Sequence, residues 1–240
     1  MLTKYFFITG SSKGLGRALV NELLKDSHNK VFGLSRTNTI RHQNFTFIKI
    51  DLFDTKSLNK FSFPPIENVH QLVLINNAGT IGEIKHVGKK DSSEIFKTFQ
   101  LNTIAPAILS NQFIKQYQNL KASKSILNIS SGAGRHTISS WAEYCASKSA
   151  LDMYSQVVDE EQAEQKHPFK LFSIAPGIID TDMQTEIRSA DKNDFAQLDY
   201  FKNLKHTNSL DKPEDIASLI ISILDTSKKG QGVLLDVREL

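Results

Sequence analysis

Seven short runs rich in apolar residues recur along this chain of 240 residues, and longer segments with helical periodicity separate most of them. Most of the runs are almost continuously apolar, which is typical of strands buried on both faces of a parallel sheet. Strands that alternate with helices form β-α-β units, and such units build a doubly wound α/β sheet with helices on both faces. The predicted strands are Lys4–Thr9, Lys30–Ser35, Thr46–Asp51, Gln71–Asn76, Ser125–Ser130, Lys170–Ala175 and Gly232–Val237.

No repeat, low-complexity tract or linker divides the sequence, so residues 1–240 are predicted to form a single domain with about seven strands. Residues 178–210 interrupt the alternation because they are polar and have no strand pattern. Connections of that length are commonly functional lids or disordered segments. This one follows a predicted strand end at Pro176-Gly177, so we expect a flap with some helix that covers a substrate.

The composition disfavours several classes of partner. The formal net charge is +3, from 29 basic and 26 acidic residues, and no basic block alternates with aromatic residues, so no nucleic-acid partner is expected. The most basic stretch, 85–90, is expected to be a solvated loop. The single cysteine, Cys145, excludes an internal disulfide and cannot form a zinc site by itself, and no metal is expected. Residues 1–9 lead directly into a strand without signal-peptide features, and no run approaches the roughly 18 apolar residues of a membrane span, so we expect a cytoplasmic protein with no membrane partner.

A glycine-rich loop joins the first predicted strand to the helix that follows it. Glycines let the chain turn sharply and let backbone N–H groups approach a pyrophosphate, and the helix N-terminus adds oriented donors. Such a loop alone could be any tight turn, but the strand before it and the helix after it favour a Rossmann-type dinucleotide site. The predicted phosphate-binding residues are Gly10, Ser12, Lys13, Gly14, Leu15 and Gly16.

The end of the second predicted strand indicates which dinucleotide is bound. NAD-selective sites have an acidic residue there, which accepts hydrogen bonds from the ribose 2′-hydroxyl. Here the sequence is Ser35-Arg36-Thr37-Asn38, with no acid, and Arg36 can form charge-assisted bonds to a 2′-phosphate. The alternative is a surface arginine at a strand end. We therefore expect NADP(H), with Lys13 as a second cation.

Two further strand ends fit the same cofactor. The Asp51 carboxylate, followed by Leu52, could accept from the adenine amino group, and the small residues of Asn77-Ala78-Gly79 let backbone pass close to the adenine ribose. Taken alone, Asp51 could be a helix cap and Asn77-Ala78-Gly79 a turn. Their position at successive carboxyl ends of strands, where open α/β sheets bind ligands, favours the cofactor site.

Tyr144 and Lys148 are four residues apart in a helical pattern and therefore lie on one face, one turn apart. A free tyrosine titrates at about 10, and a nearby ammonium would lower that pKa towards neutrality. Such a pair also occurs by chance on solvated helices. Ser131 follows the predicted strand Ser125–Ser130 and lies thirteen residues before Tyr144, and its hydroxyl could donate to a substrate carbonyl. Because alternation sends Ser130 and Ser131 to opposite faces, only one is expected in the site.

Six motifs follow one another along nearly the whole chain: Thr9-Gly10-x-x-x-Gly14-x-Gly16, Asn76-Asn77-Ala78-Gly79, Asn102, Ile129-Ser130-Ser131, Tyr144-x-x-x-Lys148 and Pro176-Gly177. In these motifs the sequence resembles the short-chain dehydrogenase/reductase family. The resemblance implies that Ser131 polarises a carbonyl, that Tyr144 donates the proton, and that Lys148 tunes Tyr144 and holds the nicotinamide ribose. It further implies that Asn102 anchors a relay water (otherwise it is an interior helix amide). Pro176, Gly177 and Thr181 would hold the nicotinamide end of the cofactor.

Within that family, residues 176–184, 130–145 and 232–237 are similar to the sepiapterin reductase and benzil reductase branch. That likeness implies a ketone or vicinal dicarbonyl substrate, with Trp141 and Met183 beside it, although Trp141 could equally be a packing residue. It also implies that Asp236 anchors the substrate, although local pairing with Arg238 is an equal alternative. The family likeness implies a homodimer or homotetramer formed through the helices of Asn102 and Tyr144.

The sequence therefore predicts an NADPH-dependent carbonyl reductase. One alternative is an alcohol dehydrogenase of the same family working oxidatively, which the NADP preference disfavours because cells keep that pool reduced. The other is a catalytically silent NADP(H)-binding sensor or scaffold. Such a protein would be expected to lose Ser131, Tyr144 or Lys148, and all three are present.

Overall fold

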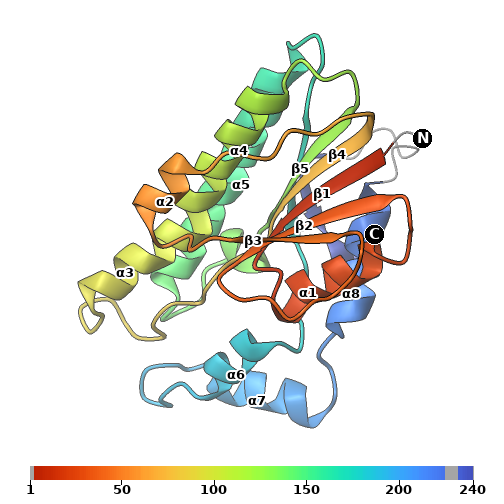
Figure 1. The fold of residues 1–240 in the computed structure, drawn as a ribbon. Coiled ribbons are helices and arrows are strands. Elements are labelled where there is room, and N and C mark those ends of the chain that lie inside the picture. Colours follow the sequence, from red (N-terminus) through yellow and green to blue (C-terminus); the bar gives the residue numbers. More distant parts are fainter. Residues whose placement is uncertain (1–2, 225–231, 240) are drawn as a thin grey trace.

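The computed structural model describes residues 3–224 and 232–239 of the chain (Figure 1). Within these residues one sheet has seven strands in the order β3-β2-β1-β4-β5-β6-β7, and every neighbouring pair is parallel. The predicted doubly wound α/β fold is confirmed, and each predicted strand begins and ends within two residues of the observed one. The strands are β1 Thr3–Thr9, β2 Asn29–Ser35, β3 Phe45–Lys49, β4 Val69–Asn76, β5 Ser123–Ile129, β6 Lys170–Ala175 and β7 Leu234–Asp236.

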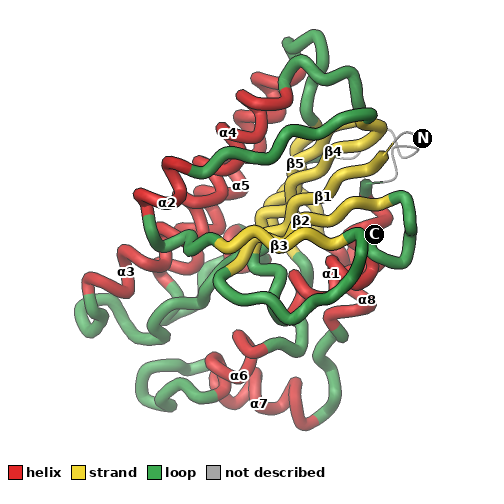
Figure 2. The backbone as a smooth tube through the Cα atoms, viewed as in Figure 1, coloured by secondary structure: helices red, strands yellow, loops and turns green. Residues whose placement is uncertain are grey.

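Helices cover both faces of the sheet (Figures 1 and 2). On one face lie α1 (Gly14–Leu23) and α8 (Pro213–Ile223). On the other lie α2 (Thr55–Lys60), α4 (Ala105–Tyr117) and α5 (Ala142–Ala163). A further helix, α3 (Ser92–Phe99), continues through one turn of π-helix, Gln100–Ile104, into α4.

Apolar side chains of the central strands hold the two helical layers to the sheet. Alternate residues of β1 point to opposite faces, so that Ile8 packs with α1 and α8, whereas Phe7 packs with α4. Both side chains are completely buried. Phe113 of α4 meets Phe7 edge-on, with ring centroids 5.6 Å apart. Burial of both faces explains why the strands are continuous apolar runs in the sequence.

The strand order reverses beside β1. From β1 the chain builds β2 and β3 on one side and then returns to place β4 on the other. The loops that leave the carboxyl ends of β1 and β4 therefore diverge, and a crevice opens between them, which is where sheets of this kind bind ligands. This reversal positions the site described below.

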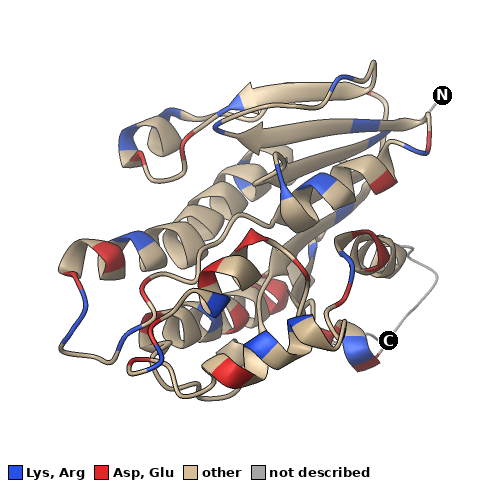
Figure 3. Cartoon of the chain, turned by 90° about the horizontal axis from the view of Figure 1, so that it is seen from below, with Lys and Arg blue, Asp and Glu red and all other residues tan. Residues whose placement is uncertain are grey.

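Residues 178–210 contain two short helices, α6 (Asp182–Arg188) and α7 (Leu198–His206), which lie beyond the carboxyl ends of the strands, at the bottom of Figure 1. Basic and acidic residues are interspersed over the whole ribbon rather than gathered in a block (Figure 3). Among the residues that the structure describes, no helix combines the length and the apolar character needed to cross a membrane.

Candidate active site

A cleft of about 1010 Å³ opens at the carboxyl ends of the strands, where the strand order reverses. The loops after β1, β2, β3, β4, β5 and β6 all contribute to its wall. Every residue expected to bind the cofactor lines this cleft. These residues are Gly10, Ser12, Lys13, Gly14, Leu15, Gly16, Arg36, Asp51, Leu52, Asn77, Ala78, Gly79, Tyr144, Lys148, Pro176, Gly177 and Thr181.

The loop between β1 and α1 requires glycine for two different reasons. Gly10 and Gly14 have φ angles of +67° and +53°, a left-handed conformation that other residues rarely adopt. Gly16 instead has no room for a side chain, because a Cβ there would lie 2.2 Å from the carbonyl oxygen of Gly10. The three glycines therefore allow a tight turn beside the cleft, between the end of β1 and the start of α1.

Replacement of Gly16 by alanine is expected to lower the free energy of unfolding by about 1–3 kcal/mol, because the loop must shift to admit the methyl group. Denaturant unfolding of the two proteins measures this loss. Gly232→Ala is the matched control, since no atom lies within 4 Å of the position that its Cβ would take. Equal stability of the Gly16→Ala and Gly232→Ala variants would show that the loop tolerates a side chain.

The β1 and β4 loops are bonded to each other across the strand reversal. The Thr9 hydroxyl accepts from the backbone N–H groups of Asn77 (2.9 Å) and Ala78 (3.0 Å). In return, the side-chain amide of Asn77 donates to the Thr9 carbonyl at 2.9 Å. The Asn-Ala-Gly sequence is therefore more than a turn, because it fixes the glycine loop in place.

The cations expected near the adenosine end have different surroundings. Arg36 is exposed, and its guanidinium lies 6.0 Å from the centroid of the Phe53 ring. Lys13 donates to Asp182 at 2.8 Å, and both side chains are largely exposed, so this ion pair is weak. Asp51 accepts from the backbone N–H of Phe53 at 3.0 Å. The cap of α2 is Asp54 rather than Asp51.

Ser131, Tyr144 and Lys148 all line the same cleft. Tyr144 and Lys148 lie in the first two turns of α5, and both are buried. Lys148 Nζ donates to the carbonyl oxygen of Ile129, at the end of β5, at 2.7 Å. It lies 5.9 Å from the centroid of the Tyr144 ring. Ser130 also lines the cleft, so the expectation that only one of the two serines reaches it is wrong.

Burial dominates the electrostatics of this pair. It raises the pKa of Tyr144, and hydrogen bonding with the Ser131 side chain opposes that rise. Burial lowers the pKa of Lys148 to about 8, and the Asp152 carboxylate one turn further along α5 opposes that fall. We expected the lysine to lower the pKa of Tyr144, but in the protein alone the cost of burying a phenolate is larger. The phenol is thus kept protonated and able to donate.

Asn102 does not line the cleft but lies behind it, fully buried in the π-helical turn. Its side-chain oxygen accepts from the N–H of Thr80 and its amide donates to the Thr80 carbonyl, both at 2.9 Å. The same amide donates to Ser147 Oγ on α5 at 3.1 Å. Asn102 therefore ties the β4 loop to the helix of Tyr144. π-Helical turns are frequent at functional sites, and nothing in the sequence indicated this one.

An aromatic cluster forms the wall of the cleft next to Tyr144. The Trp141 and Tyr144 rings meet edge-on, with centroids 5.6 Å apart, and Phe195 from residues 178–210 stacks on Trp141 at 5.5 Å. Met183 lines the cleft, as do four apolar residues that sequence reasoning missed. These are Ile81, Ile138, Ile187 and Phe201. They come from two loops and two helices and carry no local motif that could have identified them.

Two expectations about charged residues need correction. Asp236 does not line the cleft, because Arg238 takes both carboxylate oxygens, at 2.9 Å and 2.5 Å, and it is Arg238 that reaches the cleft. The loop 85–90 is not uniformly solvated, because Lys90 is buried in an ion pair with Glu143, the residue before Tyr144. In both cases a buried charged side chain is paired with an oppositely charged neighbour, Asp236 with Arg238 and Lys90 with Glu143.

Together, the glycine loop at a strand reversal and the Ser-Tyr-Lys group in the same cleft define a dinucleotide-dependent enzyme of the Rossmann class. Comparison with known proteins gives the family: the model of the short chain dehydrogenases matches residues 4–192, and the chain belongs to that family of nicotinamide-dependent oxidoreductases. The resemblance stated from the motifs is thereby confirmed.

The similar proteins include members of the expected branch. The chain is 35% identical over 240 residues to a benzil reductase ((S)-benzoin forming) of Bacillus subtilis (strain 168), with 98% of each chain covered. It is 27% identical over 208 residues to a sepiapterin reductase of Mus musculus, covering 78% of each. A solved structure of 4-hydroxyisoleucine dehydrogenase complexed with NADH superposes with a TM-score of 0.81, at 26% identity, covering 98% of this chain and 96% of that one.

Proposed function

We propose that this protein is an NADPH-dependent carbonyl reductase that converts a ketone or vicinal dicarbonyl into the corresponding alcohol or hydroxyketone, with Tyr144 as the proton donor. The observation that carries this proposal is the meeting of Ser131, Tyr144 and Lys148 in the cleft that the glycine loop also lines. The similarity to a benzil reductase over nearly the whole chain supports the same reaction class.

The cleft fits a dinucleotide. A Cβ at Gly16 would fill the space between the glycine loop and Asn77, so the close turn that holds a pyrophosphate at a helix N-terminus in such sites needs glycine at this position. Arg36 would bind the 2′-phosphate, and the absence of an acid at the end of β2 supports NADP(H) over NAD(H). At the other end, Lys148 would hold the nicotinamide ribose and Thr181 the carboxamide.

Bound NADPH would supply the hydride that adds to the carbonyl carbon, and one proton must then reach the carbonyl oxygen to complete the alcohol. The Ser131 hydroxyl is positioned to donate a hydrogen bond to that oxygen and polarise the carbonyl. The phenol of Tyr144 transfers its proton to the same oxygen, and the positive charge of Lys148 stabilises the phenolate that remains. Residues 178–210, through Phe195 and Phe201, would exclude water from the reacting groups.

The direct test follows the loss of NADPH absorbance, and separately of NADH absorbance, with benzil, phenylpropanedione, sepiapterin and simple ketones. We expect turnover with NADPH and a dicarbonyl. Tight NADPH binding without turnover of any of these compounds would instead favour a sensor or scaffold. A strong preference for oxidation of an alcohol by NADP⁺ would favour a dehydrogenase.

The value of kcat/KM for reduction is expected to fall as the pH rises through about 8, because Lys148 loses its proton there. Below that pH the ammonium form is complete, and the raised pKa of Tyr144 keeps the phenol protonated throughout. The Asp152 carboxylate raises the pKa of Lys148, so Asp152→Asn should move the alkaline limb to lower pH. A limb that stays in place in this variant would assign the titration to another group.

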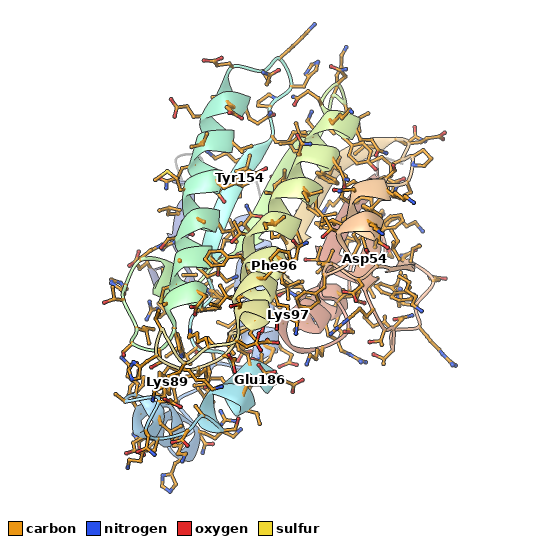
Figure 4. All side chains as sticks on the ribbon, turned by 90° about the vertical axis from the view of Figure 1, so that its left-hand side faces the viewer. Asp54, Lys89, Phe96, Lys97, Tyr154 and Glu186 are labelled. Carbon is orange, nitrogen blue, oxygen red and sulfur yellow. The ribbon has the colours of Figure 1, made fainter. Side chains whose placement is uncertain are left out.

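We further propose a homodimer or homotetramer that forms through α3, the π-helical turn and α5. This face exposes four large apolar side chains, of which Phe96 is labelled in Figure 4. They are Phe96 (60% exposed), Ile104 (39%), Met153 (60%) and Val157 (46%). Light scattering should report the mass of two or four chains, and the mass of one chain would contradict the proposal.

A further inference from the structure

Three buried polar atoms of residues that line the cleft have no hydrogen-bond partner among the described residues: Oγ of Ser130, Nε1 of Trp141 and Oε1 of Gln184. Trp141 is 5% exposed and Gln184 is 6% exposed, and both residues line the cleft. Native proteins rarely leave buried polar atoms unpaired, because such atoms lose water and gain nothing in return. A ligand in the cleft can supply the missing partners.

Trp141 is fixed next to the proton donor. Its indole meets the Tyr144 ring at an interplanar angle of 83°. Phe195 and Phe201 lie 5.5 Å and 5.4 Å from the indole, and because their own centroids are only 5.7 Å apart they cover the same face of it. A substrate held by Tyr144 therefore has the indole as an immediate neighbour.

Gln184 approaches the same region from the first turn of α6. Its backbone N–H donates to the Thr181 carbonyl at 2.9 Å, which fixes the start of the helix. Ile187, three residues later on the same helix face, packs in one cluster with Trp141 and Tyr144. Both Gln184 and Ile187 line the cleft. The carboxamide of Gln184 can present either its oxygen or its NH₂ group to a ligand.

Two charged side chains of the cleft are already engaged in ion pairs. Arg238 is bonded to Asp236, and Lys13 to Asp182. Ser130 Oγ is the third buried atom without a partner, and it is adjacent in sequence to Ser131, which the proposed function assigns to the reacting carbonyl. Trp141 and Gln184 thus each bring an unpaired buried polar atom to the cleft.

We propose that Trp141 and Gln184 bind a second oxygen of the substrate, next to the carbonyl that Tyr144 protonates. The indole N–H of Trp141 donates to this oxygen, and the NH₂ group of Gln184, brought to it by rotation of the carboxamide, donates the second hydrogen bond. The inference rests on the proposed function and narrows the substrate class to compounds with two adjacent oxygens, in particular aromatic 1,2-dicarbonyls, over ketones with a single oxygen.

Benzil and deoxybenzoin form a matched pair of substrates, because they differ only in the second carbonyl. In Trp141→Phe, kcat/KM is expected to fall at least about tenfold for benzil and less than about threefold for deoxybenzoin, since one hydrogen bond is lost and the aromatic wall is kept. Gln184→Ala should change the ratio in the same direction. Phe201→Leu alters the aromatic wall without removing a polar group. It should therefore lower kcat/KM by the same factor for both substrates. An equal fall for both substrates in Trp141→Phe would overturn the inference.

A measurement on the unmodified protein avoids any failure of a variant to fold. Trp141 is the single tryptophan of the chain, so the ¹⁵N-labelled protein has one indole N–H resonance. In the presence of NADP⁺, which cannot reduce the ketone, benzil is expected to move this proton downfield relative to deoxybenzoin. If benzil and deoxybenzoin shift the indole resonance equally, the inference is contradicted. This holds even if the protein reduces benzil and does not reduce deoxybenzoin. A wild-type protein that reduces no carbonyl compound would contradict the proposed function itself, which distinguishes that failure from a failure of this inference.

Discussion

Replacing Tyr144 by phenylalanine is expected to lower kcat for carbonyl reduction by about 10²–10⁴-fold, the usual contribution of a positioned general acid. The phenol is the group in the cleft that burial keeps protonated, and Ser131 and Lys148 line the cleft beside it. Phenylalanine keeps the ring that packs against Trp141, so the fold and the aromatic wall should survive. Single-turnover reduction of benzil by NADPH measures the chemical step.

Tyr154→Phe is the matched control for that experiment. Tyr154 lies on the same helix, two to three turns further along, and its hydroxyl donates to the Ala107 carbonyl at 3.2 Å, outside the cleft. Its replacement should leave kcat within about a factor of three, and NADPH affinity should be similar in both variants. A Tyr144→Phe protein that retains most of its activity would remove Tyr144 as proton donor and leave Ser131 as the candidate.

Replacing Arg36 by alanine is expected to lower kcat/KM for NADPH by about 10–100-fold, while kcat/KM for NADH changes little. The loss corresponds to the charge-assisted hydrogen bonds that a guanidinium makes to a phosphate. NADH has no 2′-phosphate, so its binding does not depend on this charge. Initial rates with each cofactor at a fixed concentration of benzil give the two values.

Arg41→Ala is the control for the loss of one positive charge. Arg41 is also an exposed arginine, but it does not line the cleft, so the ratio of NADPH to NADH efficiency should not change. The assignment of Arg36 to the 2′-phosphate would be contradicted by a wild-type protein that prefers NADH. It would also be contradicted if Arg36→Ala lowered kcat/KM equally for NADPH and NADH. In that case its contact with the Phe53 ring would be its principal interaction.

The sequence was sufficient for the fold because the apolar runs are long and the glycine loop follows a strand directly. It was also sufficient to predict that the residues assigned to the cofactor line one cleft, since their positions follow from the ends of consecutive strands. The side-chain partnerships were harder to predict. The pairing of Lys90 with Glu143 joins residues 53 positions apart, and the packing of Trp141 with Phe195 joins residues 54 positions apart. No local pattern encodes such contacts.

Burial had a similar effect on the chemistry of the site. The spacing of Tyr144 and Lys148 correctly placed them on one helix face, but spacing says nothing about desolvation. The pKa of Tyr144 therefore moves in the opposite direction to the one we expected from the lysine charge alone. The role of Asp236 was equally hard to predict. Its carboxylate could bind either a substrate or Arg238, and in the structure it binds Arg238.

The bonds between Thr9 and Asn77 also constrain the order in which the chain can fold. The phosphate-binding loop is synthesised within the first 16 residues, but its partner loop follows β4, some 60 residues later. The β1–α1–β2 segment can form early, because its contacts are local, whereas pairing of β1 with β4 must close a long stretch of chain. The glycine loop therefore reaches its final shape only after β4 has joined the sheet, and a nascent chain that lacks β4 is expected to bind NADPH poorly.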